Sequence, residues 1–552
     1  MDTRRLILVL IFTFSSFVLW ENWQKYNQPT PAAGAVATDP TGNIAPKPSA
    51  ALQAGLPVSG APVVAPAGAS VPTAETFTVS TDLIKATISA QGGDLVELEL
   101  LKYKAHDDKE KTFQLLELKH QYAAQSGLIG DGLPSHRSTF KRVDGATSLA
   151  DGTDELKIRL EAVAGNGIKV AKILTFKRAS YVIDVAWEIT NGSDKPLAPH
   201  AYFQLQRDDV KPEGETKMVS TFTGPAVYTE ADKYQKVSFE DVAANKAKFA
   251  KMADNGWLAI VQHYFVSAWI PKDKTQHEFY MRKLEGANVF QAGLIVPFTE
   301  IAPGARGETS VSLYAGPQEQ NVLKDLATGL DLVVDYGWLS LVAKPIFWAL
   351  QTIHSLVGNW GWAIVVLTII IKAIFFPLSA ASYKSMAKMR ILTPRLAQLK
   401  ERFGDDKARL NQEMMKLYQT EKVNPLGGCL PILVQIPVFI SLYWVLLGAV
   451  EMRDAPWVLW IHDLASADPY YILPVIMMVS MFVQTKLNPT PPDPIQAKVM
   501  LMMPLIFGFM FFWFPAGLVL YWVVNNVLSI AQQWKITRMM ETGGKAANDD
   551  KA

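Results

Sequence analysis

One lysine lies inside a stretch that is apolar enough to enter a lipid bilayer. The run WAIVVLTIIIKAIFFPL (362–378) contains Lys372, and Thr368 lies one helical turn earlier on the same face. A buried ammonium in hydrocarbon costs at least ~2.5–3.5 kcal/mol, so water or polar groups are expected beside it. Alternatively, Lys372 lies near the cytosolic end of a helix and extends its amine to the headgroups. The run alone does not separate these alternatives.

More polar side chains occur in the apolar stretches that follow. Each of them can hydrogen-bond to a neighbouring helix, which is the usual role of such residues. Together with Lys372 they suggest a polar cavity, open to the cytosol, that could shelter polar residues of a polypeptide entering the membrane. The sequence has no G-x-x-x-x-G-K-[ST] nucleotide loop, so hydrophobic partitioning would have to supply the work. These polar residues are Gln435, Ser441, Gln484, Asn525, Asn526, Gln532 and Gln533.

Composition indicates a membrane protein with a soluble part attached. The 552 residues are 49% hydrophobic and include 15 tryptophans, and the net charge is only +1. So small a net charge gives no reason to expect DNA or other nucleic acid as a partner of the whole chain. The single cysteine, Cys429, excludes an internal disulfide and a zinc cluster of thiolates. No metal or cofactor is expected.

The N-terminal region contains an apolar run and then a polar tether. Arg4 and Arg5 precede the apolar run 6–20, and no cleavage site follows closely, so residues 1–26 are predicted to be an uncleaved signal anchor. Residues 27–76 are rich in Pro, Ala, Gly and Ser and lack aromatic residues. Such a segment cannot bury a core, so we predict a disordered linker.

Residues 77–325 are predicted to form a large antiparallel β-sandwich outside the cytosol. Apolar and polar residues alternate at 76–89, 156–163, 169–178 and 181–190, and turn residues separate these runs. The last strand is expected near 313–317. The region's histidines show no metal-ligand spacing, so turn or core roles are favoured over catalysis. They are His106, His120, His136, His200, His263 and His277.

The remaining chain alternates apolar stretches with polar loops. Residues 326–360 are predicted to form an amphipathic helix in the membrane interface. Residues 361–540 would be the membrane core, and with the anchor its spans make six. Several spans are shorter than the ~20 residues that a ~30 Å hydrocarbon core requires, so local thinning of the bilayer is expected. The five core spans are at about 361–380, 426–450, 470–486, 498–514 and 517–535.

The basic loop 381–424 is predicted to be a cytosolic helical hairpin. Its excess of Lys and Arg places it in the cytosol, together with both chain termini and the tail 541–552. Thr393-Pro394 is expected to begin one helix and Asp405 to cap the next. Its methionines could bind apolar clients or fill the seam between its helices, and its basic surface could contact ribosomal RNA or anionic lipid. The candidate contact residues are Met386, Met389, Arg390, Met414 and Met415.

Several long motifs resemble the YidC membrane-protein insertases of Gram-negative bacteria. The resemblance covers almost the whole chain after the linker. It implies a non-enzymatic, six-span protein of the bacterial inner membrane, with a five-helix core around a hydrophilic groove and a periplasmic β-super-sandwich similar to sugar mutarotases. It also implies that nascent membrane proteins are the clients and that membrane lipids, the Sec translocon and the ribosome are partners. The motifs are NPLGGCLPILVQIPVFISLYWVL (424–446), LWIHDLASADPYYILP (459–474), FPAGLVLYW (514–522), GDDK (404–407), QHYFVSAWIP (262–271), YAGP (314–317) and LDLVVDYGWL (330–339).

The resemblance also assigns roles to single residues. Lys372 occupies the position of a groove cation that is usually arginine, so the charge is kept but the planar bidentate fork is lost. Thr368 and Trp522 match positions that contact nascent chains, and Gln435 and Asn525 complete the predicted groove. The implied mechanism is insertion without nucleotide hydrolysis. A polar or acidic client tail would pause near Lys372 while its apolar segment moves into lipid.

Two other functions fit parts of the sequence. A cation and several amides in the membrane also suit a transporter or channel, although the spans show neither a duplicated pattern nor paired carboxylates. The outer sandwich could instead be a carbohydrate-acting enzyme on a membrane anchor.

Overall fold

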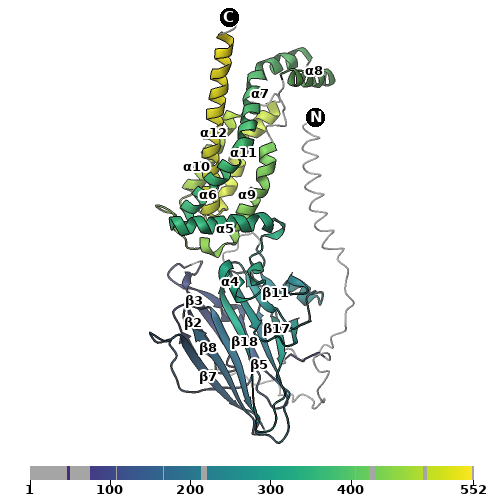
Figure 1. Cartoon of the computed structure of the whole chain (residues 1–552), viewed down its shortest axis with the longest axis vertical. Coiled ribbons are helices and arrows are strands. Elements are labelled where there is room, and N and C mark those ends of the chain that lie inside the picture. Colours follow the sequence, from purple (N-terminus) through teal and green to yellow (C-terminus); the bar gives the residue numbers. More distant parts are fainter. Residues whose placement is uncertain are drawn as a thin grey trace. The chain divides into compact units, whose positions relative to one another are not determined.

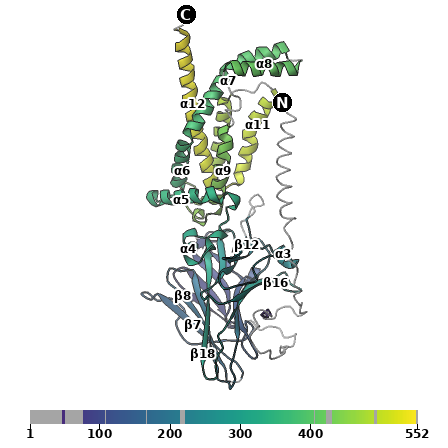
Figure 2. The same cartoon turned by 45° about the vertical axis from the view of Figure 1, so that its right-hand side comes forward.

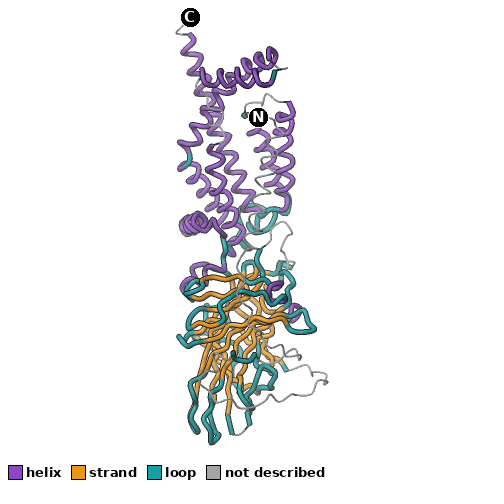
Figure 3. The backbone as a smooth tube through the Cα atoms, turned by 90° about the vertical axis from the view of Figure 1, so that its right-hand side faces the viewer, coloured by secondary structure: helices purple, strands orange, loops and turns teal. Residues whose placement is uncertain are grey.

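The chain divides into two compact units. A sandwich unit contains Pro40–Gly337 and the later segment Gly448–Asp454, and a helical unit contains Met1–Asp39, Trp338–Leu447 and Ala455–Ala552. The strands gather in the first unit and the long helices in the second (Figure 3). The predicted anchor 1–26 and most of the linker 27–76 lie outside the described residues. The computed structural model describes residues 46–49, 75–106, 108–165, 167–212, 221–403, 406–421, 430–488 and 494–549.

The first sheet of the sandwich unit has nine strands, and every pair is antiparallel. Its order is β1-β2-β3-β5-β10-β17-β16-β13, with β4 beside β3. The strands are β1 (Thr76–Ser80), β2 (Ile84–Ser89), β3 (Leu95–Lys104), β4 (Thr112–Leu116), β5 (Ala123–Ile129), β10 (His200–Arg207), β13 (Met252–Ala253), β16 (His277–Lys283) and β17 (Phe290–Pro297).

The second sheet also has nine antiparallel strands, in the order β12-β11-β14-β15-β18-β9-β8-β7-β6. The strands are β6 (Lys141–Arg142), β7 (Glu155–Val163), β8 (Lys169–Lys177), β9 (Val182–Thr190), β11 (Gly224–Thr229), β12 (Lys233–Lys236), β14 (Trp257–Gln262), β15 (Phe265–Pro271) and β18 (Arg306–Pro317). Short helices α3 (Phe239–Ala243) and α4 (Gln320–Leu326) complete the unit.

Apolar side chains from the two sheets meet in a common core. Alternate residues of β9, namely Ile183, Val185 and Trp187, are buried, as a period of two requires. Phe203 of the first sheet packs against Trp269 of the second, with ring centroids 5.2 Å apart. The predicted antiparallel sheets are therefore confirmed, and the predicted final strand is β18.

The helical unit begins with two helices joined by a tight turn. Residues 330–339 form two short 3-10 turns, and α5 (Ser340–Val357) begins after them. Gly358, with φ +71°, ends α5, and the Asn359 side chain then accepts a hydrogen bond from the Trp362 N–H to cap α6 (Trp360–Ile374). Helix α6 packs against α5.

A sharp bend separates α6 from α7 (Phe376–Phe403), whose axes differ by 67°. Taken singly, no helix within the described residues combines the length and the apolar character that crossing a membrane requires. By those two criteria alone, the bent pair of α6 and α7 meets the requirement.

The basic hairpin consists of α7 and α8 (Lys407–Thr420), and it corrects one prediction. Pro394 lies inside α7 instead of beginning a helix, because the buried Leu392 and Leu396 continue one apolar face across it. The Asp406 side chain caps α8 by accepting hydrogen bonds from the N–H groups of Ala408 and Arg409. The predicted cap, Asp405, lies outside the described residues.

Four further helices complete this unit: α9 (Leu430–Gly448), α10 (Ile472–Leu487), α11 (Pro494–Met510) and α12 (Ala516–Asp549). Helix α12 packs against α6, α7 and α10, and α10 also packs against α11. Helix α12 continues well past the apolar stretch that ends at 535, since a helix does not stop where its sequence becomes polar unless a cap or proline ends it.

Three histidines of the sandwich unit are buried without charge. His136, His200 and His277 are nearly inaccessible, and the Nε2 atoms of His200 and His277 have no hydrogen-bond partner within the part of the chain that the structure describes. Loss of hydration lowers the pKa of all three, and that of His136 falls to about 4. Burial acts in the opposite direction on the carboxyl of Asp94, whose pKa rises to about 6 despite the neighbouring Lys172.

These histidines predict that the sandwich unit loses stability in acid. Between pH 6.5 and pH 4 the unfolded chain binds a proton at His136 but the folded chain does not. The free energy of unfolding therefore falls by roughly 3 kcal/mol across that window. The raised pKa of Asp94 has the opposite effect on stability in acid, but only one carboxyl acts in that direction and three histidines act in the other. Urea titration of the full chain, with hydrogen-exchange labelling of β9 and β10, should show unfolding at lower urea as pH falls. His200→Gln should flatten the pH dependence, and the exposed control His106→Asn should not.

Candidate functional site: a polar cluster around Lys372

The candidate site lies where α6 meets α12. These two helices lie side by side (Figures 1 and 2). We call the residues Lys372 on α6, Tyr383 on α7, Gln435 on α9, and Asn525 and Ser529 on α12 the Lys372 cluster. Because Lys372 and Gln435 lie in apolar helices, and Asn525 and Ser529 lie in the apolar part of α12, the cluster is a group of polar side chains in a largely apolar part of the helical unit.

Lys372 is buried, with only 5% of its surface exposed. Its Nζ donates a hydrogen bond to the Ser529 Oγ at 2.7 Å. Among the described residues no carboxylate forms an ion pair with it, whereas the buried Lys172 of the sandwich unit has Asp94 at 3.2 Å. The ammonium therefore has a neutral partner, and its charge is not balanced by any described side chain.

Ser529 links Lys372 to the rest of the cluster. Its hydroxyl donates to the backbone carbonyl of Asn525 at 2.7 Å, and the Tyr383 side chain also hydrogen-bonds to it. One hydroxyl therefore joins α6, α7 and α12. The Gln435 Nε2 donates to the Asn525 Oδ1 at 3.4 Å, a long bond that links α9 to α12.

The other residues of the predicted groove lie on the same helices. Thr368 is buried, but its hydroxyl donates to the carbonyl of Ile364 in its own helix at 2.7 Å and not to Lys372. Trp522 is half-buried, and its ring lies 4.6 Å from Phe439 of α9 and 5.8 Å from Phe511. Its Nε1 is buried without a hydrogen-bond partner among the described residues. An orphaned indole N–H is costly, so a donor is available there to an incoming acceptor.

The remaining membrane amides and hydroxyls mainly join helices. Asn526 donates to Ser480 of α10 at 3.1 Å, and Gln533 donates to Asn488 at 3.0 Å. The buried Ser441 hydroxyl donates to Pro437 within α9. Gln484 is half-buried, and the Gln532 Oε1 is buried without a partner among the described residues.

The predicted contact residues of the basic hairpin divide by exposure. Arg390 is exposed, and 55% of the Met415 surface is accessible, so both side chains are available to a partner. Met386, Met389 and Met414 are half-buried. An ion pair from Arg395 to Glu421 links α7 to the residue that follows α8, at 2.5 Å.

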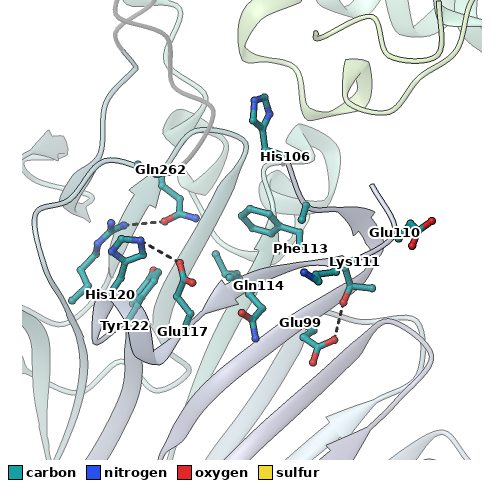
Figure 4. Close-up of a pocket in the computed structure, with 15 residues that line it drawn as sticks. Glu99, His106, Glu110, Lys111, Phe113, Gln114, Glu117, His120, Tyr122 and Gln262 are labelled. Carbon is teal, nitrogen blue, oxygen red and sulfur yellow. Dashed lines mark hydrogen bonds and ion pairs between the residues drawn. The ribbon is translucent and has the colours of Figure 1, made fainter. Parts of the chain in front are cut away.

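The sandwich unit contains a cleft of about 510 Å³ lined by the β3–β4 hairpin and by Glu117, His120 and Arg207 (Figure 4). His120 lies between two carboxylates, with its Nδ1 2.9 Å from Asp208 and its Nε2 3.6 Å from Glu117. The Nδ1 contact is a hydrogen bond, whereas the distance from Nε2 to Glu117 is too long for one. Among the described residues no cluster of His, Cys, Asp and Glu could hold a metal ion.

Sequence reasoning missed Ser529 and Tyr383. A serine in an apolar helix is common and carries no signal by type, and Tyr383 lies beyond the apolar run. The spacing did hold information, because Ser529 follows Asn525 by four residues and therefore lies on its face of α12.

A bacterial inner-membrane protein with a periplasmic domain is the class that these features and the comparisons define. Residues 76–349 match the model of the YidC periplasmic domain, and residues 352–543 match that of the 60Kd inner membrane protein family. The chain is 80% identical over all 552 residues to the membrane protein insertase YidC of Dechloromonas aromatica. It is 59% identical to that of Aromatoleum aromaticum, over 98% of each chain. The chain belongs to the YidC family of membrane protein insertases.

A solved structure described as an active YidC insertase with its first transmembrane domain resolved is also similar. It is 20% identical, with a TM-score of 0.39, and the match covers 84% of this chain and 92% of that chain.

The geometry predicts that Ser529 contributes more to stability than its size suggests. Ser529→Ala leaves the Lys372 ammonium without its hydroxyl acceptor, so the helical unit should lose about 1–3 kcal/mol. Thermal unfolding of the full chain in detergent, followed by helical circular dichroism, measures this loss. Ser441→Ala is the matched control, because Ser441 is equally buried and makes only the bond to its own helix. Equal losses in both variants would contradict the prediction.

Proposed function

We propose that this chain performs the insertase function of its family at the Lys372 cluster, where the ammonium binds polar or acidic groups of a nascent membrane protein. The observation that carries the proposal is a buried cation whose described partner is a neutral hydroxyl. An uncompensated charge in an apolar surrounding is costly, and it is tolerated where a functional partner arrives. Lysine carries the same positive charge as arginine but cannot bind a carboxylate through two parallel hydrogen bonds. We therefore infer that the site needs a positive charge more than it needs a specific geometry for binding a carboxylate.

The mechanism follows from partitioning and needs no nucleotide. A client hairpin enters from the cytosol, and its polar tail pauses at the Lys372 cluster while its apolar segment leaves the helical unit for lipid. Removing apolar surface from water supplies about 25 cal/mol per Å². Moving one negative charge outward adds ~2.3 kcal/mol per 100 mV of membrane potential.

The proposed topology is six spans, with both termini in the cytosol and the sandwich unit in the periplasm. The core spans would include α6, α9, α10, α11 and α12, grouped around the cluster. Large apolar side chains exposed on α10 and α11 support contact with lipid, since soluble surfaces seldom expose so many together. They include Val475, Val479, Leu501, Leu505, Ile506 and Phe509.

Partners beyond the clients and lipids are proposed from the exposed residues of the basic hairpin and from the family resemblance. The exposed Arg390 and Met415 suit a surface that meets a ribosome or an apolar client segment. Joint action with the Sec translocon rests on the family resemblance alone.

Reversing the charge at the site should abolish insertion of clients that have acidic outer tails. Lys372→Glu places a carboxylate where the client's own carboxylates must pass, and Lys372→Arg should retain activity. Insertion by purified variants in vesicles, scored by protease protection of the client tail, measures the effect. Lys486→Glu, which changes an exposed lysine on α10, is the charge-matched control. Normal insertion by Lys372→Glu would overturn the assignment of the site.

Removing the sandwich separates this proposal from its rivals. A chain without residues 80–310 should still insert clients in vesicles, because the Lys372 cluster lies wholly in the helical unit. A carbohydrate-acting enzyme would lose all function in this deletion. A transporter or channel would instead support solute flux in client-free vesicles and would show no protection of client tails.

A further inference from the structure

One short segment belongs to the sandwich unit although it lies far away in the sequence. Gly448–Asp454 clusters with the sandwich unit, while the chain on either side belongs to the helical unit. Ala449, Val450 and Met452 are each only 1% exposed. The segment is therefore buried, and its contacts group it with the sandwich unit.

An arginine in this segment occupies an aromatic site on the sandwich unit. The guanidinium of Arg453 lies 5.1 Å from the ring centroid of Phe113, 5.4 Å from that of Phe265 and 5.8 Å from that of Tyr264. Its Nη2 donates to the Lys104 carbonyl at 2.6 Å. Phe113 and Phe265 are themselves stacked 4.1 Å apart, so they present a preformed surface. A planar cation among aromatic faces is a specific contact.

A second contact lies one residue further along. Lys109, in the hairpin between β3 and β4, forms an ion pair with Asp454 at 2.6 Å. Lys104, Lys109 and Phe113 all belong to this hairpin. The hairpin therefore contacts the segment through the Lys104 carbonyl, the Lys109 ammonium and the Phe113 ring. We call these residues, with Arg453 and Asp454, the Arg453 site.

Chain connectivity gives the Arg453 site a mechanical role. Gly448 is both the last residue of α9 and the first residue of the held segment. Helix α9 also contains Gln435 of the Lys372 cluster. The last residue of α9 is therefore covalently part of the segment that the sandwich unit holds.

We propose that Arg453 is a positioning residue through which the sandwich unit holds the connection between α9 and α10, and so sets the position of α9 during insertion. The inference rests on the proposed function for its effect on insertion, but the holding contact can be measured independently. The sandwich unit would then have a role that involves neither catalysis on carbohydrates nor binding of clients. It would modulate insertion, which takes place at the Lys372 cluster.

Hydrogen exchange of the full chain in vesicles tests the contact. Arg453→Ala should accelerate exchange about tenfold or more in peptides covering 448–454 and 104–113, because it removes three cation–π contacts and a charged hydrogen bond. Arg453→Lys should fall between Ala and the natural residue. Strands β7 and β8 should exchange as before. Arg159→Ala is the control, because Arg159 lies on β7 and forms two ion pairs there. This variant should leave the exchange rates of the 448–454 and 104–113 peptides unchanged. Unchanged exchange at 448–454 in Arg453→Ala would overturn the proposal.

A charge exchange tests the second contact. Lys109→Asp and Asp454→Lys should each accelerate exchange of the segment about two- to fivefold, as expected for a partly exposed pair, and the double variant should restore protection. Loss of protection in the double variant equal to the sum of the two single effects would overturn the assignment of the pair.

Insertion assays on the same variants separate positioning from mere packing. Arg453→Ala should slow insertion several-fold at saturating client, and Arg453→Lys should recover part of the rate. Faster exchange with an unchanged insertion rate would overturn the positioning role. Failure of the proposed function has a different signature: Lys372→Glu would then insert normally, while the exchange results for the Arg453 site would be unaffected.

Discussion

The helical unit depends on keeping one ammonium in an apolar surrounding. Lys372 is sequestered by α6, α7 and α12, and the described partner of its amine is the neutral hydroxyl of Ser529. The sandwich unit handles the same problem differently, because its buried Lys172 has Asp94, the Gly92 carbonyl and the face of Trp187 around it. A fully compensated lysine is a structural element, whereas a lysine left with a neutral partner keeps its charge available.

That contrast explains why several polar helix contacts surround the cluster. Asn526 with Ser480 and Gln533 with Asn488 connect α12 to α10 or to the residue that follows it, so α12 has polar ties on more than one side. Hydrogen bonds between helices in an apolar medium contribute modestly one by one, but they fix rotation about the helix axis. Rotation of α12 determines whether Ser529 faces Lys372, so these remote amides support the site without being part of it.

Much of this architecture could be predicted from local patterns. Alternation at 156–163, 169–178 and 181–190 corresponds to β7, β8 and β9, since a half-buried strand must alternate. The predicted apolar stretches likewise overlap α9, α10 and α11. Strand order was not predictable, because pairings such as β10 with β5 and β17 join segments far apart in the chain. Pro394 misled the prediction of a helix start, as tertiary packing of α7 outweighed its local preference.

The sequence could predict several of the charged and polar residues that belong to the candidate site, but it could not predict their hydrogen-bond partners. Lys372 and Asn525 stand out because their types are expensive in apolar helices, and that cost is visible in any sequence. Ser529 carries no such signal. Thr368 is buried on α6, but its hydroxyl bonds to the backbone of its own helix, and this choice depends on side-chain rotation rather than on spacing.

The bend between α6 and α7 has a geometric consequence for the lysine. Lys372 stands four residues before Phe376, where α7 begins. The two axes differ by 67°, so the end of α6 that carries the amine and the long α7 arm point in different directions. A force applied at the far end of α7 would therefore act on the amine across this bend and not along the α6 axis.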